Sequence, residues 1–264
     1  MTAQPKILVL AGRRSSTLDP LAAKMGVTHK ALVPVAGEAM VGRVLRIADE
    51  AFPEAPLFVS VEDFAVIAEE PTVKRLEAAG RLTPVPAQHH IVDSVVEASR
   101  TTGFPLLITT ADNVLMTPEG LHAMSEAGEQ GDADAIVMLA ERRDILAAHP
   151  DGQRRFYEFR GGGYSNCNLF WLRSGKALKA TEGFRYGGQF AKRKKDAVRA
   201  LGLASLFLYL SKLLTIEAMF RHFSRRFGVR LQPLVMRDGR LAIDVDNERT
   251  HRVAEEILAR QAVA

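Results

Sequence analysis

Short apolar stretches recur through the first 140 residues, and their spacing restricts the fold more than any other feature of the chain. The stretches with strand character are Ile7–Ala11, Leu57–Val61, Leu82–Pro86, Phe104–Thr110 and Ala135–Ala140. Those at Ile7, Leu106 and Ile136 are apolar without interruption. Such strands are typical of a parallel sheet that helices cover on both faces, because no side of the strand then meets water.

Segments of helical spacing lie between these stretches. They are Met40–Ala51, Phe64–Ala79, His90–Thr101 and Pro118–Ala127, and Pro71 is expected to break the second of them into two helices. The repeated order of strand, helix and strand predicts an α/β fold with an open, mostly parallel, Rossmann-like sheet. In such a sheet the ligand lies at the carboxyl ends of the strands.

The pattern changes after Ala140. Two strands, Arg155–Arg160 and Asn166–Leu172, are expected to be joined by a flexible turn at Gly161–Gly163. Val229–Met236 is expected to form a further strand and Asn247–Gln261 the closing helix. We expect residues 1–264 to form a single domain, with 185–230 as a basic, amphipathic helical insertion within it.

The insertion concentrates the positive charge of the chain. It holds eleven Lys or Arg residues against Asp196 and Glu217, whereas the whole chain has a net charge of +4, so the remainder is acidic. A basic face that is not spread over the fold argues against nucleic acid as a partner. Helical spacing of Leu203, Leu206, Phe207, Leu210, Leu213 and Leu214 predicts an apolar stripe that continues towards Phe223. The stripe either packs on the sheet domain or on a second subunit, or it rests on anionic lipid.

Two features indicate a cytoplasmic protein. Cys167 is the single cysteine, so no disulfide forms within the chain and a reducing compartment is expected. The apolar stretch Ile7–Ala11 is too short for a signal peptide or a membrane span.

The loop after the first strand has the composition of an anion site. Leu10, Ala11, Gly12 and Arg13 lead from an apolar strand into a polar, basic loop, which offers backbone N–H groups and guanidinium groups to a triphosphate. The alternative is an ordinary surface loop. The stretch Leu10–Thr17 fits neither the dinucleotide-binding glycine pattern nor the P-loop pattern, which disfavours both of those classes.

Four further residues are candidates for the chemistry. Lys30 precedes a short apolar run, where a fixed ammonium stabilises charge on a transferring phosphate, although an ordinary exposed lysine is the alternative. Asp112 stands where an apolar strand emerges, a natural position for a Mg²⁺ ligand, and an ordinary loop carboxylate is the alternative; a capping role is not expected, because Thr117 is the better cap for the next helix. Asp244 and Asp246 would share one face of a strand, and Asp246 either caps the last helix or joins Asp112 on one Mg²⁺ ion.

These clusters together resemble the MobA-like nucleotidyltransferases, a family that includes molybdenum-cofactor guanylyltransferase and is similar to sugar-phosphate nucleotidyltransferases. The matching pieces are Leu10–Gly12, Lys30–Gly37, Ala111–Asn113 and Ile243–Asp246. The resemblance implies a fold of the nucleotide-diphospho-sugar transferase type. It also implies that Gly12 with Arg13 and Lys30 contact phosphates, that Asp112 and Asp246 bind Mg²⁺, and that Gln88 and Ser94 read the nucleobase.

The phosphate loop departs from the pattern of that family. The family loop usually reads G-x-G-x-R, whereas this chain has Gly12 followed by Arg13, Arg14 and two serines. The guanidinium is present but displaced, and the missing glycine restricts how closely the backbone wraps a phosphate.

The expected function is Mg²⁺-dependent nucleotidyl transfer from an NTP, with CTP or GTP expected, to a phosphorylated small molecule with release of pyrophosphate. Lys30, Arg13 and Asp112 are the expected catalytic residues. The residues expected to bind the acceptor are Gly162, Gly163, Tyr164, Asn166 and Asn168. The alternatives are a nucleotide-sugar glycosyltransferase and a nucleotide-binding relative without catalysis.

Overall fold

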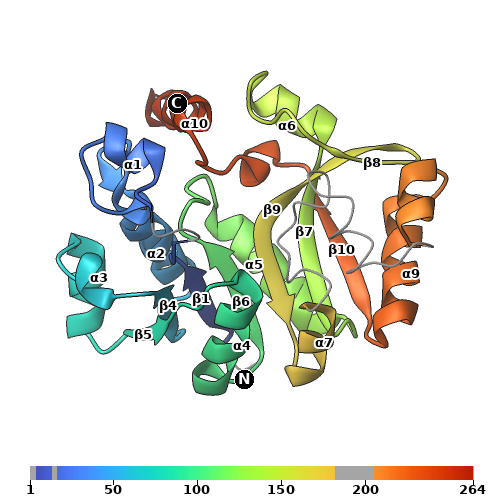
Figure 1. Ribbon diagram of the computed structural model, residues 1–264, viewed down its shortest axis with the longest axis horizontal. Helices are drawn as coiled ribbons and strands as arrows, with labels where there is room; N and C mark the ends of the chain where they lie inside the picture. The colour runs from blue at the N-terminus through green and yellow to red at the C-terminus, as the bar shows by residue number, and fades with distance from the viewer. Residues whose placement is uncertain (1–3, 14–16, 182–204, 264) are drawn as a thin grey trace.

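The computed structural model describes residues 4–13, 17–181 and 205–263 (Figure 1). Its strands are β1 Lys6–Leu10, β2 Pro34–Val35, β3 Glu38–Ala39, β4 Leu57–Val61, β5 Leu82–Pro86, β6 Leu106–Thr110, β7 Ala135–Glu141, β8 Tyr157–Phe159, β9 Gly162–Leu172 and β10 Leu231–Met236. Its α-helices are α1 Pro20–Lys24, α2 Met40–Ala51, α3 Pro71–Ala78, α4 Ile91–Thr102, α5 Pro118–Gln130, α6 Arg142–Ala148, α7 Leu178–Thr181, α9 Ile216–Phe227 and α10 Glu248–Val263. Short 3₁₀ turns are η1 Lys30–Leu32, η2 Phe64–Val66, η3 Gly175–Ala177 and η5 Gly239–Ala242.

The main sheet is mostly parallel, as the apolar stretches predict. Within the described residues its order is β10-β7-β9-β6-β1-β4-β5, with β8 paired to β9, and β9 runs antiparallel to both β6 and β7. The chain passes from β1 outward to β4 and β5 and then returns to place β6 on the other side of β1. This change of direction makes the carboxyl ends of β1 and β6 the expected position for a ligand.

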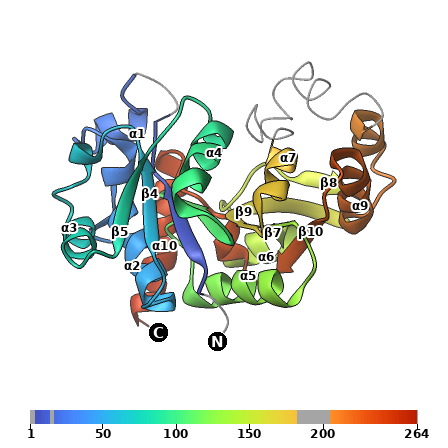
Figure 2. The ribbon, with the colours of Figure 1, turned by 90° about the horizontal axis from the view of Figure 1, so that it is seen from below.

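Side chains from neighbouring positions of β1 serve two separate cores. Ile7 and Val9 belong to the core that also contains residues of α2, α5 and α10, whereas Leu8 belongs to the core that contains Val95 of α4. Figure 2 shows α4 on one side of the sheet and α2 and α5 on the other. Both faces are therefore covered, which explains why these strands lack polar alternation.

The structure corrects four details of the predicted elements. Gly162 and Gly163 lie inside β9, so the turn is formed by the residues before them, where Gly161 has a φ of +104°. Only a 3₁₀ turn, Phe64–Val66, precedes α3, which starts at Pro71. The strand expected at Asp244 and Asp246 is absent from this described segment, because Gly239–Ala242 forms η5 and 243–246 is irregular.

The fourth correction concerns the helical stripe, which does not continue as one helix towards Phe223. Residues 185–204, including Leu203, lie outside the described residues, whereas residues 205–211 are helical and α9 is a separate helix. Phe207, Leu210 and Leu213 are 70%, 58% and 65% exposed, so described residues do not cover this part of the stripe. None of the helices in the described ranges has the length and apolar character needed to cross a membrane.

One glycine sets the distance between α5 and the sheet. A Cβ built on Gly128 would lie 2.3 Å from the ring of Trp171, which is 1% exposed. Gly128→Ala is therefore expected to lower the free energy of unfolding by about 1–3 kcal/mol through overpacking, although Ala is the better helix former. Urea unfolding measures the change. Gly175→Ala is the control, because its Cβ would meet Phe104 at an ordinary 3.7 Å, and equal losses in both variants would contradict the packing explanation.

Candidate active site

A cleft of about 290 Å³ opens at the carboxyl ends of β1, β4, β5 and β6. Every residue predicted to bind nucleotide or metal, or to act in catalysis, lines this cleft: Leu10, Ala11, Gly12, Arg13, Lys30, Gln88, Ser94, Asp112 and Asp246. The strand order explains the convergence, since loops that follow neighbouring parallel strands emerge at the same edge of the sheet.

Three carboxylates meet at one end of the cleft. Asp112, Asp244 and Asp246 each offer an oxygen within 4.8 Å of the others. Burial raises the pKa of Asp244, because it disfavours the charged form, and repulsion from the charges of Asp112 and Asp246 raises it further. Hard oxygen ligands in such a group suit Mg²⁺, so the residues present fit the predicted ion. Asp244 was seen in the sequence but was not assigned as a ligand.

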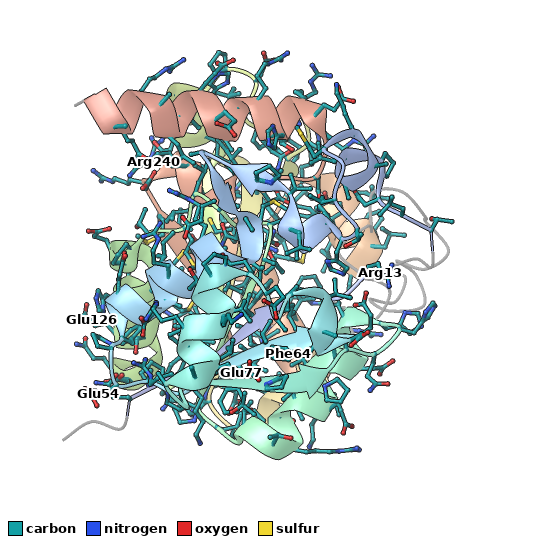
Figure 3. All side chains as sticks on the ribbon, turned by 90° about the vertical axis from the view of Figure 1, so that its left-hand side faces the viewer. Arg13, Glu54, Phe64, Glu77, Glu126 and Arg240 are labelled. Atoms are coloured by element: carbon teal, nitrogen blue, oxygen red, sulfur yellow. The ribbon has the colours of Figure 1, made fainter. Side chains whose placement is uncertain are left out.

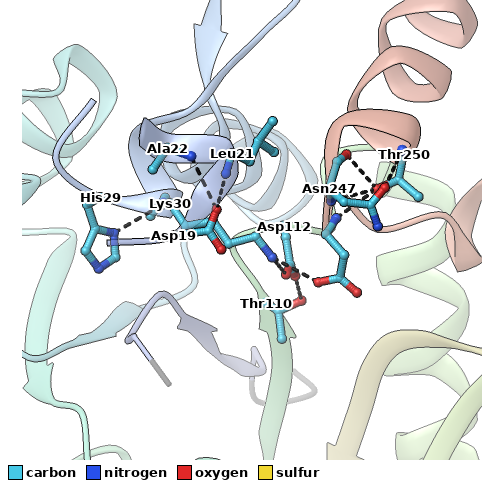
Figure 4. Close-up of polar contacts among 11 residues, drawn as sticks. Asp19, Leu21, Ala22, His29, Lys30, Thr110, Asp112, Asn247 and Thr250 are labelled. Atoms are coloured by element: carbon cyan, nitrogen blue, oxygen red, sulfur yellow. Dashed lines mark hydrogen bonds and ion pairs between the residues drawn. The ribbon is translucent and has the colours of Figure 1, made fainter. Parts of the chain in front are cut away.

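Lys30 sits between two of these acids (Figure 4). Its Nζ donates to Asp112 Oδ2 at 2.8 Å and to Asp246 Oδ1 at 2.9 Å. Burial alone would lower the pKa of the Lys30 ammonium, but the charges of Asp112 and Asp246 outweigh burial and hold that pKa above its ordinary value. The alternative of an ordinary exposed lysine is wrong, because the side chain is only 23% exposed.

Neither Asp112 nor Asp246 is used to cap a helix, so both carboxylates can contact Lys30. Asp112 Oδ1 also accepts a hydrogen bond from the Thr110 hydroxyl at 2.6 Å, which orients the carboxylate. Thr117 caps α5, as predicted, so Asp112 is not needed there. Asn247 accepts hydrogen bonds from the backbone of Arg249 and Thr250 and starts α10, so Asp246 is not that cap.

Arg13 lies at the mouth of the cleft, on the opposite side of the molecule from Glu54 (Figure 3). Its Nε forms an ion pair with Glu62, which directly follows β4, and its backbone N–H donates to Glu62 Oε2 at 3.1 Å. Glu62 Oε1 lies 3.1 Å from His29 Nε2. Neither Glu62 nor His29 was singled out from the sequence, because nothing in either segment indicates this contact.

The loop after β5 borders the other end of the cleft. Ser94 Oγ accepts the backbone N–H of Gln88 at 2.8 Å, and Ser94 is 4% exposed. Its hydroxyl therefore braces the loop, whereas Gln88 is exposed and lines the cleft.

The predicted acceptor residues lie on β9 and are not among the residues that line this cleft. Asn166 and Asn168 form a bulge against β7, in which Asn168 has a φ of +49° and their side chains bond to each other at 2.9 Å. The bulge adjoins the acid cluster, because Asn113 donates to the carbonyl of Cys167 at 2.9 Å. Tyr164 is 8% exposed and packs in a small apolar cluster with Leu139 and Ile216, while Gly162 and Gly163 pair with β8.

Comparison with known proteins agrees with this geometry. The sequence profile of the MobA-like NTP transferase domain matches residues 7–177, whereas no curated protein sequence matches. A hypothetical transferase from Thermus thermophilus is similar in structure, with a TM-score of 0.74 and 22% identity over 94% of this chain and 100% of that one.

Two further similar structures are those of enzymes whose names state an activity. CMP:2-keto-3-deoxy-manno-octonic acid synthetase in complex with CTP has a TM-score of 0.60 and 13% identity over 98% of this chain and 100% of that one. The 4-diphosphocytidyl-2C-methyl-D-erythritol synthase from Anaerococcus prevotii has a TM-score of 0.56 and 11% identity over 97% of each chain. At these identities the likeness establishes a shared fold, the one that the resemblance implied.

Proposed function

This chain belongs to the MobA-like NTP transferase family and is a nucleotidyltransferase, and on that premise we propose that it transfers the nucleotidyl group of CTP or GTP to a phosphorylated small molecule. One observation carries the proposal most directly. The ammonium of Lys30 lies between Asp112 and Asp246, and these three residues come from distant segments of the chain. Arg13, in the basic loop, lines the same cleft. This arrangement offers both a cation for phosphates and acids for a metal in one cleft.

The proposed reaction needs no covalent enzyme intermediate. An oxygen of the acceptor phosphate attacks the α-phosphorus of the NTP, a new P–O bond forms, and the bond to the bridging oxygen of the β-phosphate breaks. Pyrophosphate leaves with the electron pair. Lys30 and Arg13 stabilise the negative charge that develops on the phosphates, and Gly12 lets the loop lie close to them.

Asp112, Asp244 and Asp246 are the residues that would hold Mg²⁺. When bound, the ion neutralises phosphate charge and orients the oxygens of donor and acceptor. Lys30 already contacts Asp112 and Asp246, so the ammonium and the acids are positioned relative to each other before any ligand binds.

We propose CTP or GTP as the nucleotide donor and a phosphorylated small molecule as the acceptor. CTP is supported by the CTP complex of one similar structure and by the diphosphocytidyl product in the name of another, while GTP is supported by the family resemblance. Gln88 is proposed to contact the base, with Ser94 fixing its loop. Asn166 and Asn168 are proposed to contact the acceptor beside the acids, with Gly162, Gly163 and Tyr164 shaping that strand.

A coupled assay tests the proposal. The protein is incubated with each NTP in turn, Mg²⁺, inorganic pyrophosphatase and a panel of sugar and alcohol phosphates. We expect phosphate release only when both an NTP and a suitable acceptor are present. Because the pyrophosphatase itself needs Mg²⁺, the EDTA arm is followed by chromatography of the nucleotides, and no nucleotidyl product is expected there, since the acids would then hold no ion.

Other outcomes of that assay are equally informative. Release that does not depend on an acceptor would indicate NTP hydrolysis instead of transfer. No release with any pair, together with measurable NTP binding, would contradict catalysis and favour a nucleotide-binding relative.

A further inference from the structure

Glu62 accepts hydrogen bonds from two segments that the proposed reaction uses. Its carboxylate receives both the Nε and the backbone N–H of Arg13, and it also contacts His29 Nε2. Glu62 directly follows β4, a strand whose five residues are all buried. We call this set of contacts the Arg13–Glu62–His29 bridge.

The hydrogen bonds of His29 fix its tautomer. Nδ1 accepts the backbone N–H of Ala31 at 3.1 Å, so in the neutral ring the proton is on Nε2, which then donates to Glu62. His29 is 1% exposed, and this burial lowers the pKa of its ring although the nearby Glu62 would raise it. The lowered pKa favours the neutral form. The same ring therefore caps η1, the turn that carries Lys30, and donates to the carboxylate that holds Arg13.

We propose that Glu62 is a positioning residue that orients the Arg13 guanidinium towards the triphosphate, with neutral His29 holding Glu62 in place. This inference rests on the proposed function and explains the altered phosphate loop. Where the family has a second glycine, this sequence has Arg14, and the Glu62 carboxylate holds the displaced arginine, Arg13, instead. Of the nitrogens of Arg13, Glu62 binds Nε and the backbone N–H. Within the described part of the chain, the two terminal guanidinium nitrogens therefore stay available for phosphate oxygens.

A different role for the same carboxylate would be to stand in for a phosphate until the nucleotide displaces it. The burial of His29 argues against displacement. If Glu62 moved away, the Nε2–H of a side chain that is 1% exposed would lose its acceptor. Burial alone would raise the pKa of Glu62, but hydrogen bonds from its own backbone N–H and from the backbone and side chain of Arg13 hold that pKa below its ordinary value and keep the group charged.

Steady-state kinetics of four variants test the bridge. Glu62→Gln removes the charge, and His29→Asn keeps a side-chain acceptor for the cap of η1 but loses the donor to Glu62. Both are expected to lower kcat about tenfold while the KM for Mg²⁺–NTP changes less than about threefold, because orientation and not gross affinity is lost. In an Arg13→Ala background, the effect of Glu62→Gln on kcat is expected to disappear.

The chain offers a matched control for the histidine. His149 makes the same two kinds of bond and does not line the cleft: its Nε2 lies 2.9 Å from Glu256, and its Nδ1 accepts the N–H of Asp151. His149→Asn should therefore leave kcat unchanged. An unchanged kcat in Glu62→Gln would overturn the proposal, as would a loss that persists without Arg13. Tighter NTP binding at an unchanged kcat would identify Glu62 as a phosphate stand-in.

A second measurement does not depend on catalysis. If the wild-type protein transferred no nucleotidyl group, the proposed function would be overturned, but this measurement would still test the Arg13–Glu62–His29 bridge. Amide hydrogen exchange of the nucleotide-free protein reports the bond from the Arg13 N–H. Exchange at Arg13 is expected to be faster in Glu62→Gln than in wild type and unchanged in His149→Asn. Equal exchange at Arg13 in wild type and Glu62→Gln would show that the bridge does not hold the loop, and the proposal would fail.

Discussion

Asp112→Asn is expected to lower kcat by about 10³-fold or more while the protein stays folded. The substitution changes charge and hardly changes shape, so the packing at the end of β6 is kept. It would remove a carboxylate from the proposed metal site, and it would remove the charge that Lys30 contacts at 2.8 Å. The coupled pyrophosphate assay at saturating Mg²⁺ and NTP measures kcat, and thermal unfolding checks the fold.

Asp132→Asn is the matched control, because this aspartate is 77% exposed and pairs with Arg230 away from the cleft lining. It should retain the wild-type kcat. If Asp112→Asn also turned over at the wild-type rate under saturating Mg²⁺, Asp112 would be an ordinary loop carboxylate and its assignment as a metal ligand would be wrong.

The first half of the fold could be predicted because apolar run length and helical spacing are local properties. Leu57–Val61 and Leu82–Pro86 have the predicted bounds as strands, and Met40–Ala51 has the predicted bounds as a helix. The parallel arrangement then places the loops after β1, β5 and β6 at one edge, so the predicted residues could meet in one cleft without any further signal.

The partners of those residues could not be predicted, because they come from segments that have no pattern of their own. Glu62 and His29 are 33 positions apart and meet only because η1 folds back over the end of β4. The positions of Asp244 and Asp246 were inferred from strand alternation, but the segment before them coils into η5. The three acids nevertheless come together, since the segment still ends beside β6, where the Val245 N–H bonds to the Asp112 carbonyl.

The later half was less predictable because its strands are interrupted. The Gly162–Gly163 pair suggests a turn by composition, yet it continues β9, and the bulge at Asn168 depends on a left-handed backbone that Asn tolerates. Tyr164 looked available for a ligand in the sequence but packs against Ile216 of α9, a contact set by tertiary structure.

Lys30→Ala is expected to lower kcat by about 10²-fold or more, with a smaller loss of NTP affinity. The ammonium lies within 2.9 Å of two acids, so its removal leaves the negative charges of Asp112 and Asp246 without the cation that contacts both. Arg13 and the backbone of the phosphate loop remain to bind the NTP, so binding should suffer less than stabilisation of the transferring phosphate. Equilibrium titration with Mg²⁺–CTP and Mg²⁺–GTP gives the affinity, and the coupled assay at saturating NTP gives kcat.

Lys24→Ala separates this effect from a general loss of positive charge. Lys24 is 56% exposed, pairs with Glu248 and lies outside the cleft lining, so its removal changes net charge equally without touching the acids. We expect wild-type kcat for this variant. If Lys30→Ala lost NTP affinity but kept its kcat at saturating NTP, Lys30 would be a binding residue only, and the stabilisation of the transferring phosphate would have to come from Arg13 and the metal.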